Sequence, residues 1–266
     1  MSIRVKFVRK IVRSVISAVL RAKGYIDFKI STFLNKPYFG PYLSASQTWP
    51  ARKGVMRRLL ESELSKTDDK DYKIIEIGSW AGQSALLWAS ACKKQGKGKV
   101  FCIDTWGASV ISPKEMKDAT KKDKIMKLFL HNIRSSGLKN IIFPLRGTSN
   151  DIYEILKENT FNFIYIDGDH SYKQFKRDLE NYSKLCKVGG VICGDDFEIK
   201  LSDLDLDNAK RHSEEDFIKD TKTGIFFHPG IALGIKDFFK NANAYNGFWA
   251  IRKDKKGWKD IDFNKI

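Results

Sequence analysis

Apolar residues along the chain fall either into short continuous runs or into longer stretches with helical spacing. The short runs are rich in Ile, Val and Phe, which is typical of strands buried on both faces of a parallel sheet. Between them, apolar residues recur every three or four positions, as in amphipathic helices. Strands are predicted at 73–78, 100–104, 140–145, 163–167 and 191–195. Helices are predicted at 51–66, 82–94, 114–135, 151–157, 174–185 and 231–240, and a late antiparallel strand at 247–253.

Five strands that alternate with helices at short intervals indicate an α/β fold, a parallel sheet with right-handed crossovers. Residues 35–50 contain three prolines and read as an irregular linker. The predicted organisation is an N-terminal helical arm, a linker with a lid helix, a main domain and a C-terminal tail, at 1–34, 35–69, 70–254 and 255–266. Within the main domain, residues 198–228 are predicted to be an insertion or lid.

Basic residues are concentrated at the N-terminus of a chain whose formal net charge is +16. Residues 1–24 hold seven Lys and Arg residues and no acid. Valines from Val5 to Val19 recur there at helical spacing, which indicates a basic amphipathic helix. Such a helix would either lie on an anionic membrane surface or dock its valine face on the domain or on a partner subunit. An oligomer is therefore one of the expected alternatives.

Other features of the composition favour a cytoplasmic protein, with peripheral contact at the inner face of the membrane as the alternative. No apolar stretch reaches about 18 residues, so a spanning helix is not expected, and Arg21 and Lys23 argue against a cleaved signal peptide. The four cysteines lack metal-type spacing and are predicted to be reduced core residues. The remaining lysines are spread thinly without aromatic neighbours, which disfavours a nucleic-acid partner.

The first predicted strand leads into a turn typical of ligand-binding α/β folds. Residues 74–85 read IIEIGSWAGQSA, in which Gly78 permits a tight turn and Gly82 a close backbone approach before the helix. Such loops hold a ligand at a helix N-terminus. The lysine of a phosphate-binding P-loop is absent. Asp104 ends the second strand, about 20 residues further on, where an acid can bind both hydroxyls of a ribose.

Two further strands end in carboxylates. Residues 163–172 read FIYIDGDHSY, and residues 188–197 read VGGVICGDDF. If these strands are neighbours, about 4.8 Å apart, then Asp167, Asp195 and Asp196 crowd one small volume at the edge of the sheet. Like charges so close raise each other's pKa unless a cation or a reaction uses them. We therefore expect the chemistry of the protein at these strand ends.

Together, IEIGSW-x-G-x-S, IDGDHSY, the Gly-Gly pair before the fifth strand and GDDF resemble class I S-adenosylmethionine-dependent methyltransferases, more narrowly the macrocin-type sugar O-methyltransferases. The resemblance implies a Rossmann-like, doubly wound, mostly parallel seven-stranded sheet whose last strand is antiparallel. It also implies S-adenosylmethionine as cofactor, although Trp80 and Ala81 stand where another glycine is usual. The implied cofactor-binding residues are Glu76, Gly78, Ser79, Gly82, Asp104, Thr148, Ser149 and Asp167.

The carboxylates suggest how a hydroxyl could be activated. Three carboxylates without a nearby cysteine favour a hard cation such as Mg²⁺, and the metal-dependent relatives imply Asp167, Asp195 and Asp196 as its ligands. Asp169 matches the general-base position of sugar O-methyltransferases, and the alternative is that it caps the next helix. His170 competes for that role because it titrates near neutrality. A turn residue is the other interpretation of His170.

The resemblance thus predicts methyl transfer to a hydroxyl of a sugar or glycoconjugate. A nucleic-acid methyltransferase and a non-catalytic, membrane-associated protein of the same fold are the alternatives. His228, Pro229 and Gly230 precede the last predicted helix and would either bind the acceptor or form a simple turn. Three aromatic residues, Trp80, Trp106 and Tyr172, would either line a pocket or pack in the core.

Overall fold

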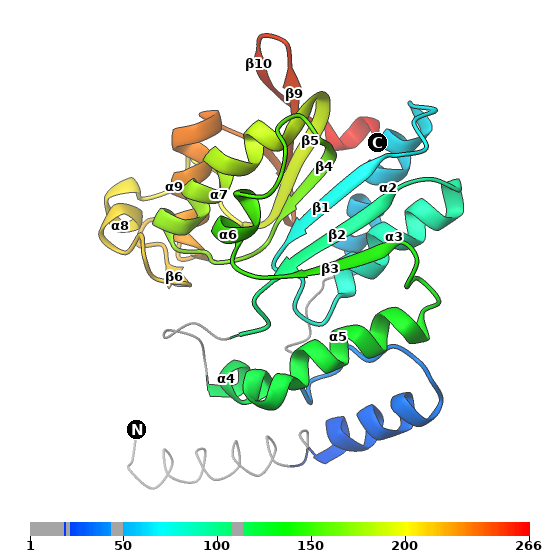
Figure 1. The fold of residues 1–266 in the computed structure, drawn as a ribbon. Coiled ribbons are helices and arrows are strands. Elements are labelled where there is room, and N and C mark those ends of the chain that lie inside the picture. Colours follow the sequence, from blue (N-terminus) through cyan, green and yellow to red (C-terminus); the bar gives the residue numbers. More distant parts are fainter. Residues whose placement is uncertain (1–18, 20–21, 44–49, 108–113) are drawn as a thin grey trace, which may run out of the picture. The chain divides into compact units, whose positions relative to one another are not determined.

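The computed structural model describes residues 19, 22–43, 50–107 and 114–266 (Figure 1). They divide into two compact units. The larger unit comprises the described residues of 48–79, 84–105 and 138–266, and the smaller comprises those of 19–47, 80–83 and 106–137. The predicted basic helix of residues 1–24 lies almost wholly outside the described residues, so its membrane contact stays a prediction. No described helix is long and apolar enough to cross a membrane.

The described part of the larger unit is built on one eight-stranded sheet. Its strands are β1 (Lys73–Ile77), β2 (Lys99–Asp104), β3 (Ile142–Arg146), β4 (Phe161–Ile166), β5 (Cys186–Phe197), β8 (Asn243–Tyr245), β9 (Gly247–Asp254) and β10 (Gly257–Asp260). The strand order is β10-β9-β5-β4-β1-β2-β3, and β8 also pairs with β9. The first five strands are parallel, whereas β9 runs antiparallel to β5. This confirms the predicted α/β class with antiparallel strands at the C-terminal end of the chain.

The sheet has one strand more than the predicted seven. The added strand β10 lies in the segment 255–266 that we expected to be a tail, and it forms a hairpin with β9. Short, mostly exposed strands such as this one lack the apolar run on which the prediction depended. A second hairpin joins β8 to β9 through Asn246 and Gly247, whose φ angles are 51° and 87°. An Asn-Gly pair is a strong hairpin signal in a sequence, although no hairpin is among the predicted elements here.

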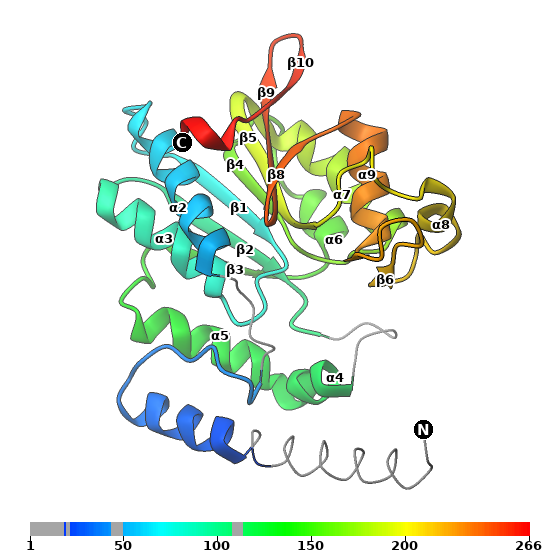
Figure 2. The same cartoon turned by 180° about the vertical axis from the view of Figure 1, so that it is seen from behind.

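Helices cover both faces of the sheet. They are α2 (Pro50–Ser65), α3 (Gln83–Gln95), α6 (Ser149–Tyr153), α7 (Tyr172–Leu185), α8 (Leu206–Arg211) and α9 (Pro229–Phe239). Figures 1 and 2 show α6, α7 and α9 on one face, with α2 and α3 on the other. Between α7 and α9 the packing is close, since a Cβ on Gly234 would lie 2.4 Å from the Phe175 ring. The arrangement is that of a doubly wound fold.

The central strand β4 carries a separate core on each face. On one face the ring of Trp88, from α3, lies 5.2 Å from Phe163 and 5.3 Å from Tyr165 between centroids. On the other face Ile164 and Ile166 join the apolar cluster beneath α7 and α9. All of these side chains are almost fully buried, which explains why the strand reads as a continuous apolar run. The four cysteines are also buried and unpaired.

The predicted insertion at 198–228 is folded. It contains α8 and a small hairpin of β6 (Ile218–Lys219) and β7 (Phe226–Phe227). Its organising residue is Asp220, which is 1% exposed and accepts hydrogen bonds from the backbone N–H groups of Asp205, Lys222 and Thr223. A buried carboxylate needs such partners, so this segment keeps a defined conformation. Lid motion stays a prediction.

The smaller unit contains a helix over residues 22–33, α4 (Lys114–Thr120), a short 3₁₀ helix (Lys121–Asp123) and α5 (Lys124–Ser135). The single helix predicted over 114–135 is therefore wrong. Lys122 and Asp123 both have φ of 56°, a left-handed conformation that no α-helix contains. Asn132 of α5 is fully buried, and its side chain joins separate segments. It accepts from Tyr38 N at 2.8 Å and donates to the carbonyls of Tyr38 and Ala81, both at 2.9 Å.

Replacing Asn132 with Leu should therefore destabilise the protein strongly. The N–H of Tyr38 and the two carbonyls would stay buried without partners, at about 1–3 kcal/mol for each group. We expect the free energy of unfolding to fall by on the order of 3 kcal/mol in guanidinium titrations. The same change at the exposed Asn140 serves as control and should cost no more than about 0.5 kcal/mol. Equal losses in the two variants would contradict a bridging role for Asn132.

Candidate active site

The site lies where the strand order of the sheet reverses. β1 has β2 on one side and β4 on the other, and ligands of doubly wound sheets bind at this position. Gly78 N donates to Ile103 O and Asp167 N donates to Ile77 O, both at 2.9 Å, so the strand ends stay in register beyond the strands themselves. Gly78 has φ of 86°, and a Cβ there would lie 1.8 Å from the carbonyl oxygen of Asp167. Only glycine fits this close approach.

The segments next to β2 and β3 complete that side of the site. Asp104 ends β2, and its carbonyl accepts from Gly147 N at 3.1 Å. Thr148 caps α6, because its Oγ1 accepts from Asp151 N at 3.1 Å. Ser149 donates to the buried Asp178 at 2.6 Å. Burial raises the pKa of the Asp178 carboxyl to about 6, against hydrogen bonds that lower it.

The end of β5 is irregular, which separates two consecutive carboxylates. The register between β5 and β9 shifts between Gly194 and Phe197, and Asp196 has φ of 66°. As a result Asp195 forms an ion pair with Arg52 of α2, whereas Asp196 lies 3.3 Å from Nε2 of His170. Burial, followed by the charge of Asp167, raises the pKa of Asp196. The carboxylates are thus near one another, as the sequence predicted, but they face different partners.

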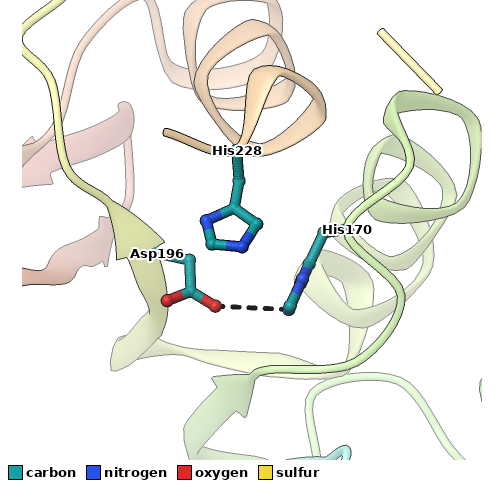
Figure 3. Close-up of side chains that lie close together, drawn as sticks. All are labelled: His170, Asp196 and His228. Carbon is teal, nitrogen blue, oxygen red and sulfur yellow. Dashed lines mark ion pairs between the residues drawn. The ribbon is translucent and has the colours of Figure 1, made fainter. Parts of the chain in front are cut away.

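Two histidines join Asp196 in a compact group (Figure 3). His170 lies in the loop before α7, and His228 lies at the N-terminus of α9. Their rings are 4.6 Å apart between centroids. Each Nδ1 has its own carboxylate, Asp216 for His170 and Glu198 for His228, both at 2.8 Å.

The two proposed bases differ in their surroundings. Asp169 is exposed, and its Oδ1 accepts from Ser171 N at 2.9 Å, so it also forms the turn before α7. Burial alone would lower the pKa of His170, but Asp167 and Asp216, with the charge of Asp196, raise it well above 6.5. Asp167 itself accepts from Tyr165 Oη at 3.0 Å.

The predicted aromatic pocket is not supported as a group. Trp106 is buried and its Nε1 donates to the carbonyl of Trp80 at 2.9 Å. It also packs on Phe129, 4.8 Å away between ring centroids, with a Cβ at Gly82 lying 2.8 Å from the same Phe129 ring. Tyr172 instead donates to Asp237 at 2.6 Å. Trp80 and Trp106 therefore pack in the core of the smaller unit.

Comparison with known proteins agrees with this geometry. A family model described as "Methyltransferase domain" matches residues 75–197, a little under half of the chain. Over these residues the chain is similar to methyltransferase domains. A curated relative, "Uncharacterized protein R132" of Acanthamoeba polyphaga mimivirus, is 25% identical over 140 residues, which cover 53% of this chain. The match spans only 58% of that relative's length.

Solved structures share the fold of the chain. The O-methyltransferase NovP is similar with a TM-score of 0.52 and 15% identity, over 81% of this chain and 85% of NovP. Cofactor-bound Rv0187 from MTB is similar with a TM-score of 0.50 and 14% identity, over 89% of this chain and 86% of that one. At these identities the likeness establishes the fold alone.

The residues around Gly78 fit a bound cofactor. Among the described residues, both carboxylate oxygens of the fully buried Glu76 lack a hydrogen-bond partner, as do Ser79 Oγ and Trp88 Nε1 beside it. Buried polar groups without partners are rare in folded proteins and point to a missing ligand or water. Direct contacts of the predicted cofactor residues stay predictions.

The fit of the predicted magnesium ligands is incomplete. Asp195 is engaged by Arg52, whose guanidinium also lies 3.9 Å from Asp196. Over the described residues, the metal-compatible group of three side chains consists of His170, Asp196 and His228 instead. Asp167 lies nearby, with its Oδ1 3.8 Å from Nε2 of His170. The three-carboxylate magnesium site thus stays a prediction, and one of its members already has a cationic partner.

Several residues of the site had no signal in the sequence. Arg52 belongs to a helix more than 140 positions before its partner, and nothing in its own segment indicates an ion pair. Glu198 and Asp216 belong to an acidic stretch that resembles a solvated surface. Of the two histidines that they contact, His228 is a predicted candidate for acceptor binding, but nothing in the sequence indicates its carboxylate partner.

The close approach at Gly78 predicts a large effect of Gly78→Ala. Gly189 has the same φ of 86° but nothing within 4 Å of a Cβ, so Gly189→Ala isolates the cost of the left-handed backbone, about 1–2 kcal/mol. Gly78→Ala should cost about 1–3 kcal/mol more because the added methyl collides with the Asp167 carbonyl. Chemical unfolding of both variants measures the difference. Equal destabilisation would show that β1 and β4 can separate without penalty.

Because Glu76 is buried, we expect the stability of the protein to depend on pH. Burial, with a smaller contribution from the charge of Asp167, raises the pKa of Glu76 from 4.5 to about 8. Between these pH values the unfolded chain loses the Glu76 proton while the folded chain keeps it, so folding weakens as pH rises, by at most about 1.4 kcal/mol per pH unit. Glu76→Gln lacks this penalty and should gain stability relative to wild type from about pH 5 to pH 8.

Urea unfolding of both proteins across that range tests the expectation. The exposed Glu158→Gln provides the control, and its difference from wild type should not change with pH. A constant difference between Glu76→Gln and wild type would mean that Glu76 is ionised in the folded protein.

Proposed function

We propose that this chain is an S-adenosylmethionine-dependent O-methyltransferase that acts on a hydroxyl of a sugar or glycoconjugate, assisted by a divalent cation. The observation that carries the proposal is the gathering of Asp167, Asp169 and Asp196 at the carboxyl ends of β4 and β5, beside the Gly78 turn. An aliphatic hydroxyl is a poor nucleophile at neutral pH, and it needs a nearby base or a cation. Carboxylates in this position could supply the base and help to hold the cation.

Cofactor binding is assigned to the β1 and β2 side of the site. The N–H groups of the turn after Gly78 and the start of α3 would face the amino-acid part of the cofactor, and Asp104 would accept hydrogen bonds from both ribose hydroxyls. Glu76, Ser79, Thr148 and Ser149 complete the proposed contacts. Bound S-adenosylmethionine supplies the electrophilic methyl group. NovP, whose fold is shared, is described as an O-methyltransferase, which supports a hydroxyl as acceptor.

Asp169 is the proposed general base. As the acceptor oxygen bonds to the methyl carbon and the sulfur–methyl bond breaks, the hydroxyl proton passes to the Asp169 carboxylate, leaving S-adenosylhomocysteine. Its exposure and its position two residues after Asp167 leave one carboxylate oxygen available, since only Oδ1 is used in the turn. His170 is the alternative base, but it is held between Asp216 and Asp196.

Cation assistance would lower the pKa of the acceptor hydroxyl. Asp167 and Asp196 are the residues best placed to contribute, and Asp195 would have to exchange Arg52 for the ion. The sugar specificity is supported by the IDGDHSY and GDDF motifs alone. A nucleic-acid acceptor or a non-catalytic role are the remaining alternatives.

The release of S-adenosylhomocysteine tests the proposal directly. Purified protein is incubated with S-adenosylmethionine and a panel of sugars, glycosides, phenols and a short RNA, with and without EDTA. We expect release with at least one sugar hydroxyl acceptor. Asp169→Asn should lower kcat by about 10²–10⁴, the usual contribution of a positioned base, with cofactor affinity retained.

The variant Asp104→Asn tests cofactor binding separately from methyl transfer. Loss of a charged acceptor to the ribose should weaken S-adenosylhomocysteine binding by about 10–100-fold, and Asp260→Asn, at the exposed end of β10, should leave it unchanged. Cofactor binding without turnover on any hydroxyl would argue for the non-catalytic alternative. Turnover only on RNA would favour the nucleic-acid methyltransferase.

A further inference from the structure

Three side chains from separate elements converge at the carboxyl ends of β4 and β5. In Figure 3, Asp196 reaches from the end of β5, His170 from the loop before α7 and His228 from the start of α9. One potential ligand atom from each lies within 4.8 Å of the other two. Ligands of one ion, each about 2.1 Å from it, lie no more than about 4.2 Å apart, so small side-chain rotations close the group. All three residues are partly exposed.

Outer carboxylates orient both imidazoles. Because Glu198 and Asp216 are acceptors, each Nδ1 of the two histidines carries a proton and donates it. Each Nε2 is therefore the atom left to bind a ligand, and Nε2 of His170 already faces Asp196. Glu198 is held further by the backbone N–H of His228 at 3.3 Å. Histidines that bind metals almost always have such a partner on the other nitrogen.

The donor set discriminates among cations. Two imidazole nitrogens and one carboxylate suit borderline transition ions such as Zn²⁺ and Fe²⁺, whereas Mg²⁺ prefers oxygen ligands. Arg52 neutralises Asp195, so a site made only of carboxylates is short of one ligand. Asp167, whose Oδ1 lies 3.8 Å from Nε2 of His170, is placed to act as a fourth ligand.

We infer that His170, Asp196 and His228 form a binding site for a divalent transition-metal ion, with Glu198 and Asp216 as its outer partners. The inference deepens the proposed function, on which its catalytic relevance rests, by naming the class of cation at the acceptor side of the site. None of these five residues is among those proposed to bind the cofactor. The inference also assigns a role to the folded segment 198–228, which supplies Asp216, Glu198 and His228.

Metal titration of the full-length protein tests the site without any acceptor or cofactor. The protein is first treated with EDTA and dialysed, and Zn²⁺ and Mg²⁺ are then titrated in separate calorimetric experiments. One equivalent of Zn²⁺ should bind, at least about 100-fold more tightly than Mg²⁺. His228→Ala should weaken Zn²⁺ binding by at least about 100-fold, and Glu198→Gln by about 10–100-fold, as expected for an outer partner.

Two control variants separate this site from other metal binding. His212 pairs with Glu215 on the surface, so His212→Ala should not alter Zn²⁺ affinity. Asp195→Asn tests the alternative three-carboxylate site, because Mg²⁺ bound there would lose affinity in this variant. Thermal unfolding of each metal-free variant shows whether it folds, and the visible spectrum of bound Co²⁺ should change in His228→Ala and remain as in wild type in His212→Ala.

The inference is overturned if His228→Ala binds Zn²⁺ as wild type does, or if Mg²⁺ binds more tightly and depends on Asp195. The first result would leave the histidines as charge partners of the carboxylates. The second would establish the three-carboxylate site. Failure of methyl transfer, with the Zn²⁺ pattern intact, would remove the proposed function and keep the metal site.

Discussion

The close approach of β1 and β4 at their carboxyl ends is the constraint on which the site depends. Backbone atoms of Gly78 and Asp167 lie so near that a single methyl group would collide with a carbonyl oxygen. This contact joins the two halves of the sheet where their strand order reverses. It places the turn after Gly78 on one side and the loop that begins at Asp167 on the other. Every proposed step needs these two segments in contact, because the methyl group must reach the acceptor oxygen directly.

A second constraint is the irregular end of β5. In a regular strand, consecutive side chains point to opposite faces of the sheet. Here the register shift and the left-handed conformation of Asp196 direct its carboxylate to His170, while Asp195 turns to Arg52. One acid is thereby neutralised by a fixed cation, and the other remains among groups that can bind an ion. Because the acids face different partners, the repulsion between their charges in this small volume is reduced.

Much of the fold could be predicted, because the central strands are buried on both faces. Their apolar runs marked β1 to β5 within a few residues, and the Gly78 turn and Asp104 followed from their spacing. Predictions failed where local pattern and structure disagree. The left-handed pair at Lys122 and Asp123 interrupts a helical pattern that the sequence continues, and the exposed strand β10 has no apolar run. Local propensity is a weak guide where tertiary packing decides.

By itself, the sequence determined the class of fold, the turn after β1 and the presence of acids at the ends of β4 and β5. These features are local, since each depends on the order of residues within one short segment. Only the tertiary structure decided which partner each acid meets. Arg52, His228 and Asp216 come from helices and loops far apart in the chain, and ion pairs depend on distance in space. The sequence therefore placed acids at two strand ends, and the packing of distant segments determined which partners those acids meet.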